Sequence, residues 1–571
     1  QQSYRNFSNA YAQAKILPGL NFRSEFGLDL LAQQEEGYWG KENNRNTSAP
    51  NGVGEYRSAF VFNYNTNNYF TYNKEIGKSN VEAVLGMQFQ KSRANYSYVE
   101  GRDFPSNAYQ KIASAATKSD GSSSQTEFSF LSYFARVNYK YNDKYLMSLS
   151  LRRDASSRFG RNSRNGYFPA ASVGWILSEE NFLSKSDVLS FLKLRASYGI
   201  VGNAEIGNFP QLGLYIGDAG YAGAAGQRPS QIANPNLKWE TTRQVDIGLD
   251  FGFFNNRISG ELQYYVKNTS GLLLNVNVPA TSGFTSQVQN VGKLENKGIE
   301  IVLNTQNLVG AFKWSTSLNM ARNRGKVVDL NGQVIEGGVG SMNRVMEGQP
   351  VGVFYTVEYA GVDPQNGDAL FYRNTNNNGQ LDKSTVNAAG YNSAQRVVTG
   401  DPNPDWVFGF TNNFSYKGFD LSVFFNGVTG NQINIYGMGR YSSANFRFED
   451  NQTRDQLGAW TTPGQITDIP QARLYRNNGA QISSRYIVDG DFIRLRNLTL
   501  GYNLPTSVVN RLKLSKLRVY VSGQNLWTIT NYPYWDPEVN ADDFDSNIAK
   551  GNDFYTAPQP RTILFGINVG L

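Results

Sequence analysis

The chain has 571 residues, with 54 Lys and Arg against 47 Asp and Glu, a net charge of +7, and neither Cys nor His. Without Cys there is no disulfide framework or thiolate metal site, and without His the commonest metal ligand and the usual general base at neutral pH are missing. The basic residues are scattered among the acidic ones and form no block for nucleic acid, so a surface that faces anionic lipid headgroups explains the charge as well.

Aromatic residues make up 13% of the chain, including 34 Tyr and 35 Phe. No window approaches the ~18 uninterrupted apolar residues that a membrane-spanning helix needs. If the chain spans a bilayer, a closed β-barrel is the remaining structure that can do so, because backbone polar groups in hydrocarbon must be paired internally. The unit to look for is a strand of about 10 residues, apolar on one face and small or polar on the other.

Segments with this alternation occur from the N-terminus onward. Residues 10–17 and 20–30 flank Pro18-Gly19 and predict a hairpin with a tight turn. Further strands are predicted, with their turns, at 55–72 and 81–89 around 74–80, and at 131–141 and 145–151 around 142–144. The pattern recurs at 168–177 with 192–201, 243–253 with 257–267, 298–305 with 311–323, 406–416 with 419–427, and 492–504 with 516–529.

The final predicted strand, 561–571, carries Ile563, Phe565, Ile567, Val569 and Leu571 on one face. With no later element to cover this face, we expect lipid to do so. About 17 strands of the length of tilted membrane strands result. We predict an all-β fold, a transmembrane antiparallel β-barrel in which Leu421, Leu500 and Phe565 face acyl chains.

The predicted connections are of two kinds. Short ones lie at 18–19, 142–144, 254–256 and 417–418, and long ones at 202–240, 268–297, 324–404 and 428–491. Short periplasmic turns and long extracellular loops are typical of outer-membrane barrels, whereas a soluble sandwich or propeller would not sort its loops so consistently.

Strand parity leads to a further expectation. Short turns follow the first, third and fifth predicted strands, so the first and the last strand both descend toward the periplasm. Two descending strands cannot close an antiparallel seam. We therefore predict that an odd number of strands precedes Gln1, and that residues 1–571 are the C-terminal part of a larger barrel.

Specific blocks resemble the SusC/RagA family of TonB-dependent outer-membrane transporters, in the family's order from about Lys140 to the end. They are Tyr139-Lys-Tyr-Asn-Asp-Lys-Tyr145, Leu151-Arg-Arg-Asp-Ala-Ser-Ser-Arg-Phe-Gly160, Phe168-Pro, Gly174-Trp175, Leu194-Arg-Ala-Ser-Tyr-Gly199, Gly202-Asn203, Asn234-Pro-Asn-Leu-Lys-Trp-Glu-Thr-Thr242, Asn296-Lys-Gly-Ile-Glu300, Gly400-Asp-Pro-Asn-Pro-Asp-Trp406, Asp489-Gly-Asp-Phe-Ile-Arg-Leu-Arg-Asn-Leu-Thr-Leu-Gly-Tyr502, Gly523-Gln-Asn-Leu-Trp527 and Asp536-Pro-Glu538.

The resemblance implies a 22-stranded barrel, with an N-terminal plug domain and a TonB-contacting segment that this chain does not contain. It also implies the outer membrane of a Gram-negative bacterium of the Bacteroidota, contact with lipid and lipopolysaccharide, and a SusD-like surface lipoprotein as partner. The chain departs from the family in ending on Leu571 instead of an aromatic residue, which puts recognition by the insertion machinery in doubt.

Aromatic residues in the long loops are the candidate ligand-binding residues. They are Tyr215, Tyr221, Tyr436, Tyr441, Phe446, Trp460, Tyr532, Tyr534 and Trp535. Aromatic faces stack on sugars or pack on peptide side chains. The alternative is that they lie in the headgroup girdle or pack the loops together.

A weaker candidate is a calcium site in 374–385. The oxygen ligands would come from Asn374, Asn376, Asn378 and Asp382, with Gly379 at the sixth position of the loop. Calcium loops of this type have carboxylates at the first positions and a bidentate Glu at the twelfth. This chain has Asn at the first positions and Thr385 at the twelfth. An Asn/Gly turn is the alternative. No other cofactor is expected.

Two other loop features point to no chemistry. The acidic cluster Asp536, Glu538, Asp542, Asp543 and Asp545 has no metal-binding spacing and reads as a solvated charge cluster. The Gly-rich stretch 217–226 lies in no strand-then-helix context, so it is not a phosphate cradle.

Three functions are compatible with this pattern. The first is TonB-dependent import of a nutrient, glycan or peptide, by a protein that is not an enzyme, since no Ser or Asp stands in a constellation with a base. The second is a structural barrel in a larger outer-membrane assembly without transport. A siderophore or haem receptor is disfavoured by the family-specific blocks and by the lack of His for haem iron.

Overall fold

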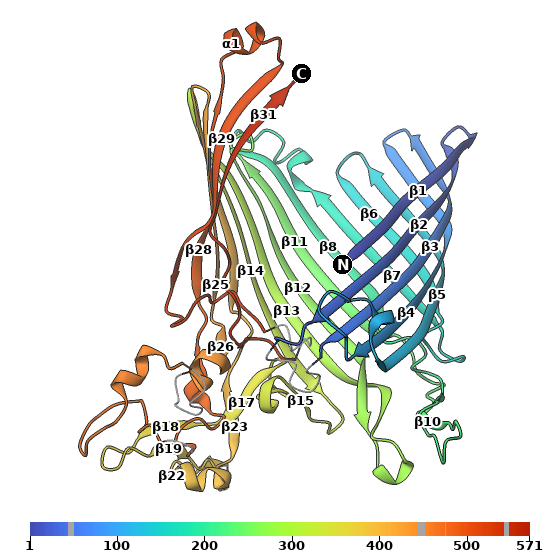
Figure 1. Cartoon of the computed structure of the whole chain (residues 1–571). Helices are drawn as coiled ribbons and strands as arrows, with labels where there is room; N and C mark the ends of the chain where they lie inside the picture. The colour runs from blue at the N-terminus through green and yellow to red at the C-terminus, as the bar shows by residue number, and fades with distance from the viewer. Residues whose placement is uncertain (44–50, 378, 443–450, 474–475, 542–547) are drawn as a thin grey trace. The chain divides into compact units, whose positions relative to one another are not determined.

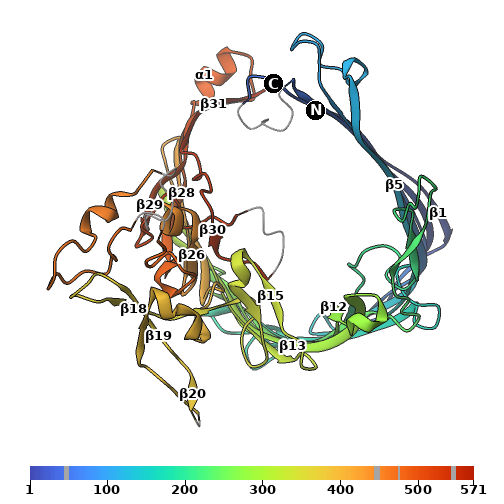
Figure 2. The same ribbon diagram turned by 60° about the horizontal axis from the view of Figure 1, so that its bottom comes forward.

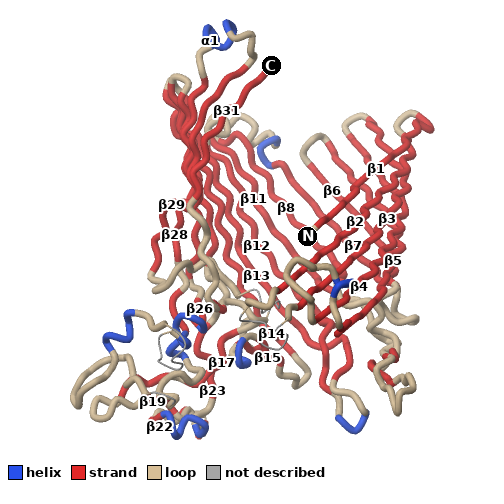
Figure 3. The backbone as a smooth tube through the Cα atoms, in the orientation of Figure 1, coloured by secondary structure: helices blue, strands red, loops and turns tan. Residues whose placement is uncertain are grey.

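The computed structural model describes residues 1–43, 51–377, 379–442, 451–473, 476–541 and 548–571. It is dominated by β-strands, and the long strands belong to one 17-stranded sheet. Helices are short and lie in the connections (Figure 3). Within the described residues, none of them combines the length and the apolar character needed to cross a membrane.

The chain forms two compact units. Unit 1 comprises 1–175, 196–244 and 269–291, and unit 2 comprises 176–195, 245–268 and 292–571. Four strands are divided between the two units: β8 (Leu189–Asn203), β11 (Glu240–Phe253), β12 (Ile258–Asn277) and β13 (Ser286–Val309); a fifth, β7 (Asn165–Ile176), has only its last residue, Ile176, in unit 2. The units are described separately below.

In unit 1, strands β1 to β7 lie side by side and pair antiparallel in chain order (Figure 1). They are β1 (Gln2–Leu17), β2 (Leu20–Trp39), β3 (Val53–Ile76), β4 (Ser79–Arg102), β5 (Thr117–Tyr141), β6 (Tyr145–Ser156) and β7 (Asn165–Ile176). The connections of this unit contain η1 (Ile112–Ser114), η3 (Ala280–Ser282), and the pair β9 (Leu214–Ile216) and β10 (Arg228–Gln231).

In unit 2, the long strands also pair antiparallel, in the order β13, β14, β24, β25, β28, β29, β31. Their bounds are β14 (Phe312–Asp329), β24 (Trp406–Tyr416), β25 (Phe419–Thr429), β28 (Phe492–Asn503), β29 (Lys516–Thr530) and β31 (Thr562–Gly570). The helix α1 (Thr506–Arg511) lies in the connection between β28 and β29, and η2 (Leu177–Glu179) in that between β7 and β8.

The long connections of unit 2 fold into small sheets. One sheet contains β15 (Ile335–Gly337), β16 (Asn343–Val345), β17 (Val353–Val357) and β23 (Arg396–Gly400); another contains β18 (Tyr359–Val362), β19 (Ala369–Tyr372) and β22 (Thr385–Asn387). A third contains β26 (Gln432–Ile435), β27 (Ile487–Asp489) and β30 (Asn552–Asp553), and β20 (Asn376–Asn377) pairs with β21 (Gln380–Leu381). The short helices are η4 (Val339–Ser341), η5 (Ala388–Ser393), η6 (Tyr436–Tyr441), η7 (Arg454–Gly458) and η8 (Ser484–Tyr486).

Apolar cores lie within these connections. Val357 of β17, Ala369 and Phe371 of β19 and Val386 of β22 form one such core, and Figure 2 shows β18, β19 and β20 grouped apart from β28 and β29. In unit 1, Phe159 and Leu237 are fully buried and pack with Trp239. The loops therefore carry folded structure of their own.

Tight turns follow from local backbone geometry. Gly19 has φ +81°, and a Cβ there would lie 2.3 Å from the Asn73 carbonyl oxygen, so only Gly fits. The Asn73 backbone N–H donates to the Gly19 carbonyl at 2.9 Å, which ties this turn to the neighbouring strand.

The long strands have two different faces, as their alternation predicts. In unit 2, Trp314, Phe414, Leu421, Leu500, Val521 and Phe565 are cross-strand neighbours in one row. Phe565 is 84% and Leu500 46% exposed, so no second sheet covers this row within the described residues. Leu421, Leu500 and Phe565 therefore share one apolar face that no second sheet in the described part of the chain covers, as a lipid-facing side requires; that acyl chains cover it stays a prediction.

The adjacent row on the opposite face is largely polar. It contains Ser315, Asn413, Ser422, Thr499 and Ser522, and the hydroxyls of the last two lie 2.8 Å apart. We refer to the two sides as the apolar face and the polar face. In unit 1, Glu25, Asn67 and Gln88 lie on the polar face by register.

Aromatic residues gather on the apolar face next to the short turns. In unit 1 the rings of Tyr141, Tyr145 and Trp175 follow one another with centroids 6.4 Å apart. In unit 2 Phe419 and Tyr502 have centroids 4.5 Å apart, beside the turn at 417–418. Rows of this kind are typical of the interface between lipid and water.

Several predicted boundaries were wrong. The turn expected at 74–80 is confined to 77–78, because β3 and β4 continue pairing to Ile76 and Ser79. Strand β5 begins at Thr117, not at 131, and the loop expected at 268–297 shrinks to 278–285. In each case residues without strict alternation extend a ladder, since backbone pairing does not require one apolar face.

Candidate functional site

Two long connections of unit 2 meet at β26. Strand β26 pairs antiparallel with β27 and parallel with β30, with Ile433 opposite Val488 and Ile435 opposite Asp553. Residues of the connection 430–491 and of the connection 531–561 thus form one small sheet. We call the side chains gathered on and around it the loop cluster.

A chain of buried amides connects three segments of the loop cluster. Asn434 Nδ2 donates to Asn552 Oδ1 at 2.8 Å, and Asn552 Nδ2 donates to Asn343 Oδ1 at 2.8 Å. Asn343 Nδ2 donates in turn to the carbonyls of Gly352 and Lys550. All three side chains are fully buried. Because an unpartnered buried amide is costly, this network fixes the segments relative to one another.

Aromatic rings and an arginine lie directly beside this network. Tyr436 and Tyr441, at the two ends of η6, have centroids 5.4 Å apart, and Phe554 lies about as close to both, at 5.9 and 6.0 Å. The Arg440 guanidinium lies over both tyrosine rings and donates to the Tyr436 hydroxyl. Burial, followed by the hydrogen bond with Tyr441, raises the pKa of Tyr436 to about 12.

Only some of these rings are accessible to a ligand. Tyr436 is 9% exposed, whereas Phe554 is 39% and Tyr555 37% exposed. The Tyr555 hydroxyl lies 2.7 Å from that of Ser442. Phe554 and Tyr555 were not predicted from the sequence, because their loop has no strand pattern; the signal available was a pair of adjacent aromatic residues after Asn552-Asp553.

Tyr532 supports the same cluster from below the surface. Its hydroxyl donates to the Asp553 carboxylate at 2.5 Å, and both side chains are buried. Burial first, and then this carboxylate, raises the pKa of Tyr532 above its ordinary value. Tyr532 therefore positions β30 and is not accessible for stacking.

The acidic residues that precede β31 are partly neutralised by arginines. Arg494 is 2% exposed and donates to both Asp536 and Glu538, and Arg496 donates to Glu538 at 2.8 Å. Burial raises the pKa of Asp536, but Arg494 and two backbone N–H groups outweigh it, so the net pKa lies below its ordinary value. Asp542, Asp543 and Asp545 lie outside the described residues.

The other predicted aromatics occupy different environments. Trp460 is 6% exposed, packs on Gly367 and donates to the Pro364 carbonyl at 3.0 Å, which is the packing alternative. Tyr534 is half-buried next to Tyr532, and Trp535 is 56% exposed. In unit 1, Tyr215 is 70% and Tyr221 86% exposed. Phe446 lies outside the described residues.

The predicted calcium residues engage in hydrogen bonds of a turn. Asn374 Nδ2 donates to Glu358, Asn376 Oδ1 accepts from the Gly379 backbone, and Asp382 accepts from Ser384. Asn378 lies outside the described residues. Among the residues that are described, no three acidic side chains converge as metal ligands. Calcium at this loop stays a prediction.

Comparison with known proteins gives consistent matches. The sequence model of the family described as "TonB dependent receptor-like, beta-barrel" matches residues 2–526. The TonB-dependent receptor P3 of Formosa agariphila is 35% identical over 590 residues, which cover 98% of this chain and 57% of the relative. The TonB-dependent receptor SusC of Bacteroides thetaiotaomicron is 30% identical over 89% of this chain and 50% of the relative.

Among solved structures, the RagAB peptide transporter is similar, with a TM-score of 0.88 and 27% identity over 100% of this chain and 62% of that chain. The chain thus spans about half to just over three fifths of the lengths of these relatives. All of them are receptors or transporters and not enzymes.

Proposed function

The chain belongs to the TonB dependent receptor-like β-barrel family, and from this membership we propose that the whole protein imports a nutrient, glycan or peptide, across the outer membrane. The match over residues 2–526 carries the proposal. The two faces of the long strands support it, because a strand that is apolar on one side and polar on the other suits lipid outside and water inside.

The loop cluster is the proposed place of ligand capture. Phe554 and Tyr555 offer partly exposed rings, and Arg440 and the buried amides hold the segments beneath them. Aromatic rings with a polar rim bind both sugars and peptide side chains. Import needs no catalytic side chain, since the energy would come from TonB.

We further propose a SusD-like surface lipoprotein as the partner at this face. The resemblance to the SusC/RagA family, which implies such a partner, and the similarity to the RagAB peptide transporter motivate the proposal. It predicts that a lipoprotein copurifies with the protein from native membranes, and that substitutions at Phe554 and Tyr555 weaken ligand retention by the complex.

The deciding experiment measures uptake in the native host with and without TonB. Growth on, and accumulation of, the nutrient should be lost in the TonB deletion and in a deletion of the protein itself. Uptake that persists without TonB would contradict the proposal and favour a structural role in an outer-membrane assembly.

A further inference from the structure

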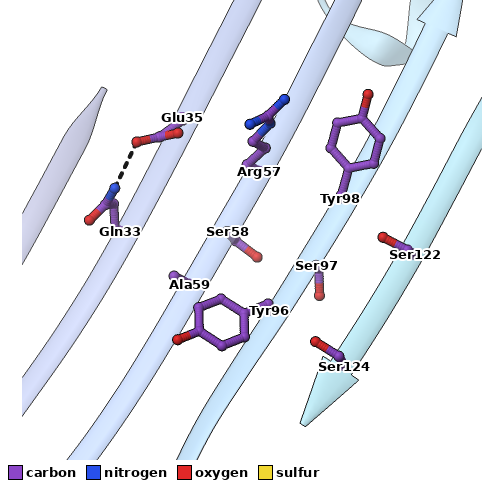
Figure 4. A pocket seen from close by; sticks show the side chains of 10 residues that line it. All are labelled: Gln33, Glu35, Arg57, Ser58, Ala59, Tyr96, Ser97, Tyr98, Ser122 and Ser124. Atoms are coloured by element: carbon purple, nitrogen blue, oxygen red, sulfur yellow. Dashed lines mark hydrogen bonds between the residues drawn. The ribbon is translucent and has the colours of Figure 1, made fainter. Parts of the chain in front are cut away.

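A hollow on the polar face of unit 1 lies outside the loop cluster. Its volume is about 380 Å³, within the range of small-molecule pockets. Two cross-strand rows from β2, β3, β4 and β5 line it: Gln33, Ala59, Tyr96 and Ser124 in one, and Glu35, Arg57, Tyr98 and Ser122 in the other. Figure 4 shows these side chains together.

The depth of the hollow comes from Ala59. It stands between Gln33 and Tyr96 in its row, and its methyl group leaves space that the longer neighbours enclose. Tyr96 is 46% exposed, so a substantial part of its ring is open to a ligand. Flat rings of this kind pack on the C–H face of a sugar.

The charged groups around the hollow already have partners. Arg57 forms an ion pair with Glu55 at 2.8 Å and lies over the Tyr98 ring, Gln33 donates to Glu35 at 2.7 Å, and the Tyr98 hydroxyl donates to Glu100. A charged ligand would have to displace one of these pairs. The site therefore favours a neutral ligand, which leaves these pairs in place.

Three hydroxyls, in contrast, remain available. In the part of the chain that the structure describes, Tyr96, Ser122 and Ser124 make no side-chain hydrogen bond, and Figure 4 marks a single bond, from Gln33 to Glu35. A hydroxyl can both donate and accept. Three such groups beside an exposed ring match a ligand whose own hydroxyls also donate and accept.

We propose that this hollow is a binding subsite for a neutral oligosaccharide. One sugar ring packs against Tyr96 above Ala59, and its hydroxyls exchange hydrogen bonds with Ser122 and Ser124. The inference rests on the proposed import function and narrows its ligand from glycan or peptide to glycan. It adds a second contact point, on β2 to β5.

The test measures the equilibrium binding of sugars by calorimetry, with the protein at its natural length and purified in detergent. The probes are maltohexaose, cellohexaose, xylohexaose and mannohexaose, with the peptide (Gly-Ser)3 as the comparison. Ala59→Leu fills the hollow and Tyr96→Ala removes its ring. Ala32→Leu is the matched control, because Ala32 lies opposite Phe60 on the apolar face of the same strands.

At least one oligosaccharide should bind, and Ala59→Leu and Tyr96→Ala should each weaken it about tenfold or more, whereas Tyr96→Phe retains the ring and costs about threefold. Ala32→Leu should leave binding unchanged. The inference is overturned if no oligosaccharide binds, if only (Gly-Ser)3 binds, or if sugar binding ignores the substitutions in the hollow.

The two proposals fail in different ways. TonB-dependent uptake that survives Ala59→Leu, together with unchanged sugar binding, refutes the subsite and leaves import intact. TonB-independent uptake refutes the import proposal even when sugar binding in vitro depends on Ala59 and Tyr96. Circular dichroism and resistance to trypsin verify that each variant is folded.

Discussion

Asn434 donates a hydrogen bond of 2.8 Å to Asn552, although 118 residues separate them in the sequence. Asn552 in turn donates a hydrogen bond to Asn343, which is 209 residues away. The two connections of unit 2 that build the loop cluster are therefore held together by amides that no solvent reaches.

Asn552→Leu should loosen the loop cluster. The change leaves Asn343 Oδ1 and Asn434 Nδ2 without their partner, at a cost of about 1–3 kcal/mol. Hydrogen exchange should accelerate in 432–441 and 549–556 and remain unchanged in β24 and β25. Asn510→Leu, at an exposed position of α1, is the control; equal protection in Asn552→Leu and the parent would refute the role of the network.

Arg494→Met should destabilise the connection 531–561 by about 3–5 kcal/mol, because it leaves the buried Asp536 carboxylate without its cation. Arg494→Met combined with Asp536→Asn should recover part of the loss. Lys140→Ala breaks a solvent-exposed pair with Asp143 and should leave the stability nearly unchanged. Thermal unfolding in detergent gives the comparison, and a double variant no better than Arg494→Met would contradict the explanation.

Acid should weaken the same connection. The pKa of Asp536 in the folded protein lies below its unfolded value, so its contribution is present above the unfolded pKa and disappears as the pH falls through the folded pKa. Limited proteolysis between pH 7 and about 2 should show 531–561 opening at low pH. Asp536→Asn should flatten this dependence; a profile identical to the parent would rule out Asp536 as its source.

Tyr436→Phe should cost about 1 kcal/mol, since Arg440 keeps the Ala480 carbonyl but loses the Tyr436 hydroxyl as an acceptor. The folded pKa of Tyr436 is about 12, above the ordinary value of 10, because burial disfavours the phenolate. The stability that depends on the neutral phenol is therefore complete below pH about 10 and is lost as the pH rises through 12. The difference in ultraviolet absorbance between the parent and Tyr436→Phe reports this titration. Tyr215→Phe, at an exposed ring, is the control for the loss of one tyrosine, and a difference curve identical to that of Tyr436→Phe would be a contrary result.

Gly19→Ala should reduce the fraction of protein that folds, because the new Cβ would lie 2.3 Å from the Asn73 carbonyl at a φ of +81°. Gly77→Asn should be tolerated, because Gly77 has φ +59° and nothing within 4 Å of a Cβ. Heat-modifiable mobility in gels quantifies the folded barrel. Equal yields of the two variants would show that the close approach at Gly19 is relieved elsewhere.

The alternation of apolar and polar residues predicted the long strands, because one side of such a strand must be apolar. The strand predicted at 406–416, for example, has the same bounds as β24. The alternation failed where both sides are polar, as in the Ser-rich start of β5, which pairs with β4 without any apolar residue to mark it. The plug and the total of 22 strands stay predictions.

The loop cluster was less predictable than the strands. Tyr436 and Tyr441 were selected by residue type, but Phe554, Tyr555 and the amides Asn343, Asn434 and Asn552 were not. Their importance comes from contacts across 92 to 209 residues, and β30 has only two residues. No local pattern can encode such a pairing.

The length of β4 determines how far the hollow at Tyr96 lies from the short turns along the barrel axis. From Ser79, beside the short turn, to Tyr96 the strand rises about 56 Å at ~3.3 Å per residue, or about 40 Å of vertical distance at a tilt of ~45°. The apolar band of such a barrel is only about 25 Å tall. In such a barrel Tyr96 would therefore lie beyond the apolar band, on the side opposite the short turns.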